Sequence, residues 1–169
     1  AAMDTVTEAN LAIALAQDPP RTHLSGNVAV ARIVDLAAQQ RGVDVRYDPK
    51  TITGTIMVRS TEGLTPDELW DLMQRALAGG GFTTVREPGG SFLHVVRANE
   101  ARATTRIDLD GALPVDAGYA AVLLRIQHRD VASIVTSVKE TLSSAGRAVR
   151  VGSDGNLMLL SDLVPRLDQ

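Results

Sequence analysis

Apolar and polar positions along this chain repeat in two periods, one typical of helices and one typical of strands. Apolar residues at i, i+3, i+4 and i+7 predict a helix over residues 28–41, and Gly42 follows where a glycine commonly ends a helix. A two-residue alternation predicts a strand over residues 54–60. That strand would place Ile56 and Val58 on one face and Thr55, Met57 and Arg59 on the other.

The strongest local signal for a helix follows this strand. Thr65 is a typical N-cap, Pro66 occupies the first helical position, and Glu68 stands where it completes a capping box with Thr65. Three glycines at 79–81 end the helix. Trp70 lies beside the apolar stripe, where core packing is favoured over anchoring a partner. The stripe itself consists of Leu69, Leu72, Met73 and Ala76.

The remaining pattern predicts short elements joined by turns. Thr5 and Glu8 form a possible capping box that predicts a short helix over residues 5–17. Residues 99–118 have no sustained period, which indicates a linker. Further strands are predicted at 22–25, 43–47, 82–86, 92–97, 120–127, 148–151 and 157–161, and helices at 130–144 and from 163 onward, with a hairpin turn at 153–156.

These elements predict an α+β chain with two small domains. Each is small enough to be marginally stable alone, so packing against copies of itself or a partner would stabilise it. The predicted parts are an N-terminal extension at 1–21, a first domain at 22–98, a linker at 99–118 and a second domain at 119–169.

The amino-acid composition excludes several kinds of core, partner and chemistry. The 169 residues are 44% hydrophobic and only 3% aromatic, so the core must consist of aliphatic side chains. A net charge of −3 gives no field that would attract nucleic acid or acidic lipid. The absence of cysteine excludes disulfides, thiolate nucleophiles and cysteine-ligated zinc. No apolar run is long enough to span a membrane as a helix, and the start at AAM favours a chain from which any leader has been removed.

The polar residues do not form a catalytic or metal-binding motif. The glycines at 79–81 follow a helix, whereas a phosphate cradle needs them before one. Asp67, Glu68 and Asp71 cluster at the start of the helix that follows Thr65, where acids interact favourably with the helix dipole. Several serines lack a nearby histidine–acid pair or a G-x-S-x-G elbow, so nucleophilic catalysis is unsupported. The sequence therefore predicts no enzyme, no cofactor and no metal site, and its histidines are widely spaced: His23, His94 and His128.

The strand–helix–strand–strand order of residues 120–169 is also found in nucleic-acid-binding K-homology domains. Those domains use a G-x-x-G loop and a basic surface. Neither is visible, since residues 119–169 contain six basic and five acidic side chains. Nucleic acid remains the weakest of the alternative partners.

The stretch VDVRYDPKTITGTIMVRSTEGLTPDELWDLMQRALAGGGFTTVREPGGSFLHVVRANEA resembles the first N-terminal domain of bacterial outer-membrane secretins, with the type II secretion secretin as the best match. The residues that carry this resemblance are Asp48-Pro49, 54–58, 64–68, Gly81-Phe82 and 92–96.

The second half is similar to the next secretin domain, a K-homology-like βαββ(α) repeat. Asn156, Leu157 and Asp162 stand near the positions of a motif of that domain without matching it perfectly. An alternative is left open, because QQRGVDVRYDP also resembles the signalling domain of TonB-dependent outer-membrane transducers, which shares the first domain's fold. Pilus and type III secretins use related domains too.

The resemblance implies a first domain with two helices packed on short mixed sheets and a non-enzymatic role in protein secretion. It implies a periplasmic portion of an outer-membrane protein that is not itself embedded in the membrane. The implied partners are other secretin subunits in a ring, the homology-region protein of the inner-membrane platform, and secreted cargo, with no nucleic acid.

A contact surface is expected on the first predicted strand and on the outward face of the strand at 54–60. An ordinary solvated sheet face explains the same mixed alternation equally well. The candidate protein-binding residues are His23, Leu24, Ser25, Thr55, Met57 and Arg59.

Overall fold

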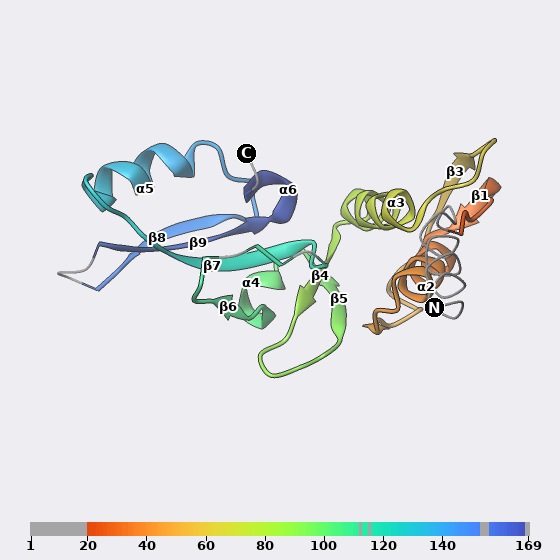
Figure 1. Cartoon of the computed structure of the whole chain (residues 1–169), viewed down its shortest axis with the longest axis horizontal. Coiled ribbons are helices and arrows are strands. Elements are labelled where there is room, and N and C mark those ends of the chain that lie inside the picture. Colours follow the sequence, from red (N-terminus) through yellow and green to blue (C-terminus); the bar gives the residue numbers. More distant parts are fainter. Residues whose placement is uncertain (1–19, 112, 115, 153–155, 168–169) are drawn as a thin grey trace, which may run out of the picture.

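The structure is a computed structural model that describes residues 20–111, 113–114, 116–152 and 156–167. The helix predicted at 5–17 and most of the turn predicted at 153–156 lie outside these residues. Figure 1 shows two units along the long axis of the molecule, and the hairpin of β4 (Phe82–Arg86) and β5 (Leu93–Arg97) is the part of the first unit that lies beside the second. The predicted α+β class with helices on mixed sheets is confirmed.

The first unit is built on two packed helices. Helix α2 (Val30–Arg41) ends at Gly42, whose left-handed φ of 64° suits glycine. Helix α3 (Pro66–Gly79) begins with the predicted capping box between Thr65 and Glu68. The predicted apolar stripes face each other across these helices, and Trp70 is 4% exposed, which confirms its place in the core. Fully buried members of this core are Ile33, Val34, Ala37, Leu69, Met73, Leu77 and Leu93.

Two small sheets flank the helices of the first unit. Strand β1 (Ser25–Ala29) pairs antiparallel with β3 (Thr55–Arg59) in a two-stranded ribbon. Strand β5 (Leu93–Arg97) lies between β2 (Val45–Arg46) and β4 (Phe82–Arg86) in a three-stranded sheet. The hairpin of β4 and β5 is therefore present as predicted.

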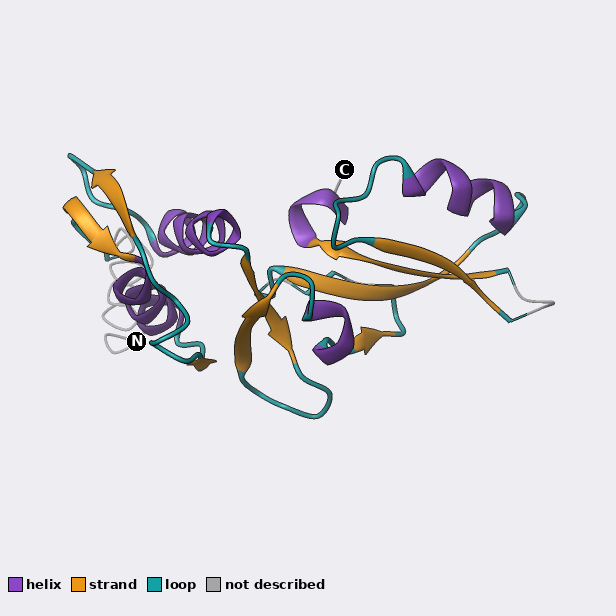
Figure 2. Ribbon diagram, turned by 180° about the vertical axis from the view of Figure 1, so that it is seen from behind, coloured by secondary structure: helices purple, strands orange, loops and turns teal. Residues whose placement is uncertain are grey.

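The second unit is a four-stranded sheet in the order β6-β7-β9-β8, with one helix on its face (Figure 2). Helix α5, capped by Asp130, packs through Val131 and Val135 against Ala148 and Met158 of the sheet. In both figures a short last helix, α6, lies on the same side as α5, and β6 is the edge strand beside β7. The elements are β6 (Ile107–Asp108), β7 (Tyr119–Arg125), α5 (Val131–Lys139), β8 (Arg147–Val151), β9 (Leu157–Leu163) and α6 (Val164–Leu167).

Several predicted boundaries are wrong. The strand predicted at 22–25 is an isolated bridge from Thr22 to Leu64, and β1 begins only at Ser25. Helix α2 starts at Val30 rather than 28, because residues 28 and 29 pair with β3. Helix α5 ends at Lys139 rather than 144.

The segment predicted as a linker contains regular structure. Helix α4 (Ala101–Thr104) and strand β6 lie within residues 99–118, and β6 pairs parallel with β7. A third apolar cluster joins α4 to both units. Its members are Val85, Ala101 and Tyr119, with Val96, Ala145 and Leu163 packed against them.

Candidate protein-docking surface

The outward face of the β1–β3 ribbon carries the predicted surface residues of β3. Ile56 and Val58 point to the core side, whereas Thr55, Met57 and Arg59 are exposed, as the alternation predicts. The register pairs Ser25 with Arg59, Asn27 with Met57, and Ala29 with Thr55. Cross-strand partners lie on one face of a sheet, and these three β1 residues are exposed as well. The outer ribbon face therefore consists of Ser25, Asn27, Ala29, Thr55, Met57 and Arg59.

Two of the six predicted contact residues do not lie on this face. Leu24 is 8% exposed and belongs to the core of the first unit, so its side chain cannot contact a partner. His23 lies before β1, and its ring comes within 3.2 Å of the position a side chain on Gly63 would take. The structure brings together Ser25, Thr55, Met57 and Arg59, and adds Asn27 and Ala29, which the sequence analysis missed. Only the pairing register identifies these two, because they were predicted near or within a helix.

Met57 is the most unusual residue of the outer ribbon face. Its side chain is 62% exposed, although its neighbours Ile56 and Val58 pack in the core of the first unit. A flexible thioether side chain adapts well to the shape of a contacting surface. Arg59 adds one exposed positive charge two residues away on the same face. The face thus offers an apolar centre with a polar border, which is the usual anatomy of a protein–protein contact.

The base of the ribbon is fixed to the first unit. Gly54, at a φ of +117°, accepts a hydrogen bond from the Val30 backbone N–H at 3.1 Å. Ser60 N–H donates to the Leu24 carbonyl at 3.2 Å at the other end of the ribbon. The first bond joins Gly54 to the start of α2, and the second closes the far end of the ribbon. The buried Val58 packs the inner face of the ribbon on the core of the first unit.

The end of α2 is tied to α3 and to the second unit by Arg41. Its guanidinium pairs with Asp67 of α3 and, at 3.1 Å, with Asp116, which precedes β7. It also stands 5.1 Å from the centre of the Trp70 ring, in cation–π range. Arg86 of β4 pairs with the other oxygen of Asp116 at 3.5 Å.

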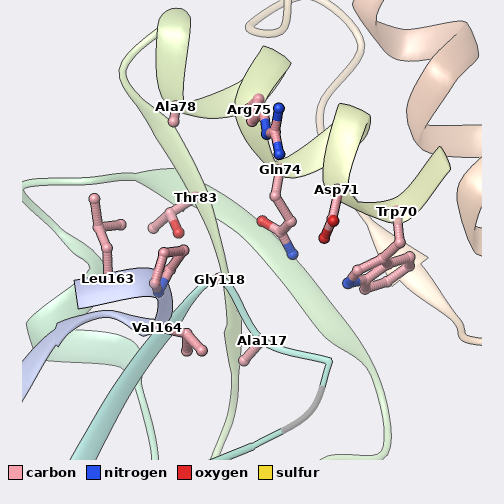
Figure 3. A pocket seen from close by; sticks show the side chains of 11 residues that line it. Trp70, Asp71, Gln74, Arg75, Ala78, Thr83, Ala117, Gly118, Leu163 and Val164 are labelled. Carbon is pink, nitrogen blue, oxygen red and sulfur yellow. The ribbon is translucent and has the colours of Figure 1, made fainter. Parts of the chain in front are cut away.

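A mostly apolar cavity of about 260 Å³ opens at the junction of the two units. We call it the junction cavity. In Figure 3 the side chains of α3 reach it from one side, and Leu163 and Val164 border it from the other. Its lining residues are Trp70, Asp71, Gln74, Arg75, Ala78, Thr83, Ala117, Gly118, Leu163, Val164 and Pro165.

Titratable groups are not gathered into a site within the described ranges. No three histidine or acidic side chains among these residues are placed to hold a metal ion. One histidine is paired with an acid: Nε2 of His94 lies 3.5 Å from a carboxylate oxygen of Glu87. None of the helices in the described residues is long and apolar enough to cross a bilayer.

Comparison with known proteins gives structural matches only. No protein-family model matches the sequence, and no curated protein is significantly similar to it. A chain of the *Klebsiella pneumoniae* type II secretion outer-membrane complex, which contains PulD, PulS and the PulC HR domain, is 17% identical with a TM-score of 0.61. The match covers 85% of this chain and 24% of that one.

Two crystal structures are also similar. The N-terminal domain of the secretin XcpQ from *Pseudomonas aeruginosa* is 17% identical, with 87% of this chain and 60% of that one covered and a TM-score of 0.37. The GspC–GspD complex from the type II secretion system of enterotoxigenic *Escherichia coli* is 13% identical, with 87% and 90% covered and a TM-score of 0.35.

The match to the *Klebsiella* complex shows that this chain has the fold of the N-terminal domains of type II secretion secretins, which confirms the predicted resemblance at the level of the fold. The chain spans 61% or less of the first three structures it matches.

Proposed function

We propose that this chain is the periplasmic docking and ring-forming module of an outer-membrane secretin channel. It contacts the inner-membrane platform during protein secretion, and it acts as a binding scaffold rather than an enzyme. The observation that carries this proposal is the outer ribbon face, where Met57 stands 62% exposed above a complete core.

The fold supports the general role. The *Klebsiella* complex, one chain of which shares this fold, also contains the homology-region (HR) domain of PulC. A homology-region domain of the inner-membrane platform is therefore the partner we assign to the outer ribbon face. Other secretin subunits and secreted cargo complete the set of proposed partners.

The geometry of the ribbon supports docking at this face. Among the described residues the ribbon has two strands, so each strand has one edge that no described strand covers. A partner strand can extend the ribbon there while side chains contact Met57 and Arg59. Because the inner face of the ribbon is packed on the core through Val58, we expect binding to cost little backbone conformational entropy. The predicted contact residues Ser25, Thr55, Met57 and Arg59 keep this assignment, and Leu24 does not.

The test is binding of a platform homology-region fragment to the chain, measured by titration calorimetry. We expect Met57→Asp to weaken binding by about tenfold or more, because it places a charge in the apolar centre of the contact. Arg59→Glu is expected to weaken it as well, mainly through the association rate. The matched controls are Val151→Asp, at an exposed apolar residue of the second unit, and Lys139→Glu, at an exposed charge on α5.

Unchanged affinity in both ribbon variants would remove the outer ribbon face as the docking site. Circular dichroism of each variant checks that the fold is retained, which is expected because both side chains are exposed.

A further inference from the structure

An exposed leucine stands next to strand β6 without any role in the core. Leu109 is 72% exposed, and Ile107, two residues earlier, is 47% exposed. Asp108 and Asp110 flank Leu109 in the chain, and Arg106 pairs with Asp108 at 3.5 Å. The β6 edge therefore presents an apolar side chain between charges of both signs.

The β6 edge and the junction cavity lie apart on the molecule. Strand β6 is an edge strand of the second sheet and pairs with β7, whereas the cavity is bordered by α3, by Gly118 before β7 and by the end of β9 with the start of α6 (Figure 1). The two features can meet when one copy of the chain stands beside another.

The cavity suits an aliphatic side chain in size and lining. A cavity of about 150 Å³ accommodates a benzene ring, so about 260 Å³ leaves room for a leucine. Trp70, Ala78, Leu163 and Val164 provide apolar contacts on its walls (Figure 3).

The charges around the two features are complementary. Arg75 and Asp71 of α3 border the cavity and are exposed. Arg75 can pair with a carboxylate beside Leu109, and Asp71 can pair with Arg106. Complementary charges at the rim of an apolar contact mainly fix its register and choice of partner.

We infer that a second copy of this chain inserts its Leu109 into the junction cavity of the first. The contact joins two different surfaces, so it is head-to-tail: the first copy keeps its leucine free, and the second copy keeps its cavity free. Such contacts repeat around a ring when the rotation between copies closes. This inference rests on the proposed ring-forming function and names the surfaces that form the ring.

The test uses single cysteines, because the chain has none of its own. Ala78→Cys places a thiol at the cavity and Leu109→Cys places one on the β6 edge, and both positions are exposed. We expect a mixture of the two variants to form a disulfide-linked dimer on mild oxidation. The double variant should give a ladder of larger species. Val151→Cys mixed with Ala78→Cys is the matched control, since Val151 is also an exposed apolar residue of the second unit.

A second measurement uses no cysteine. Leu109→Asp is expected to weaken self-association, followed by sedimentation over a range of protein concentrations, by about tenfold or more. Equal cross-linking of the test and control pairs, no cross-linking at any concentration, or unchanged self-association in Leu109→Asp would each overturn the inference.

Failure of this contact and failure of platform docking are distinguishable. Met57→Asp changes only binding of the homology-region fragment, whereas Leu109→Asp changes only association between copies. If the cysteine variants do not cross-link but the chain still binds the homology-region fragment, the head-to-tail contact is rejected and the docking proposal is not affected.

Discussion

The hydroxyl oxygen of Thr84 lies 2.7 Å from the backbone nitrogen of Gly118 and accepts its hydrogen bond. The same hydroxyl stands 2.8 Å from the Gln74 side-chain nitrogen, and the Thr84 carbonyl accepts from Gly118 N–H at 3.0 Å. Thr84 is fully buried. One threonine of β4 thus joins α3 of the first unit to the residue that precedes β7 of the second. A buried, fully bonded group of this kind favours a single arrangement of the parts it connects.

The close packing at Gly118 gives the first stability prediction. A Cβ atom at this position would meet the Gln74 side-chain oxygen and, at 2.8 Å, the Thr83 hydroxyl. We expect Gly118→Ala to lower the free energy of unfolding by about 1–3 kcal/mol, the usual cost of overpacking. Urea unfolding measures the change. Gly79→Ala is the control, because no atom lies within 4 Å of its added methyl group and alanine favours the helix. Equal stability of the two variants would contradict this account of the junction.

The capping box of α3 gives a second prediction. Glu68 accepts hydrogen bonds from the backbone N–H of Thr65 at 2.9 Å and from its hydroxyl, and these bonds lower the pKa of Glu68. Thr65→Ala removes the hydroxyl that accepts from Glu68 N–H and should cost about 1 kcal/mol at neutral pH. Thr61→Ala, at an exposed residue of the preceding loop, serves as the control.

The lowered pKa of Glu68 also fixes a pH dependence. A carboxyl whose pKa is lower in the folded state stabilises the fold above its unfolded pKa, and this contribution is lost as the pH falls through the folded pKa. The free energy of unfolding of the wild type should therefore fall as the pH is lowered below about 5. In Glu68→Gln the same change of pH should lower it by a smaller amount. Urea unfolding at a series of pH values measures both, and an identical pH profile in Glu68→Gln would contradict the role of the box.

The two tyrosines give a prediction at alkaline pH. Burial, the hydrogen bond to Asp35 at 2.7 Å and the charge of that carboxylate raise the pKa of Tyr47 to about 12. Burial raises the pKa of Tyr119 as well. The folded chain keeps these phenol protons at a pH where the unfolded chain has lost them, so their stabilisation is complete below about pH 10 and is lost as the pH rises toward 12.

Ultraviolet absorbance of phenolate measures this titration, since the chain has only two tyrosines. We expect phenolate to appear well above pH 10 in the folded protein and at about pH 10 in denaturant. Tyr47→Phe assigns the phenolate signal that belongs to Tyr47. A folded-state titration of Tyr47 at about pH 10 would disprove the effect of Asp35 and burial.

Sequence reasoning succeeded where the determining chemistry is local. Thr65, Pro66 and Glu68 stand within four positions of one another, so their order alone predicts the start of α3. The alternation of β3 is local in the same sense, and Met57 and Arg59 are exposed as it predicts. The resemblance to secretin domains added the order of elements, which the fold confirms.

Sequence reasoning failed where a residue far away in the chain determines the secondary structure of a segment. Val28 fits a helical period, yet its pairing with Ile56 places it in a strand. Helix α5 was predicted to continue through Ser143, but Asp162 of β9 accepts the Ser143 backbone N–H at 2.7 Å. A carboxylate from 19 residues away thus takes the bond that a helix carbonyl would take. No pattern within either segment could have shown these contacts.

The candidate surface shows the same limit. Sequence alone places Leu24 on a predicted surface strand, whereas β1 begins at Ser25 and Leu24 packs into the core of the first unit. Asn27 and Ala29 belong to the surface only through their pairing with β3.

The Arg41 guanidinium has a mechanical consequence. It holds the end of α2 to α3 through Asp67 and to the start of β7 through Asp116. The ribbon leads directly into α2, and β7 of the second sheet begins three residues after Asp116. If a partner docks on the outer ribbon face as proposed, these ion pairs favour one orientation of that partner relative to the second sheet.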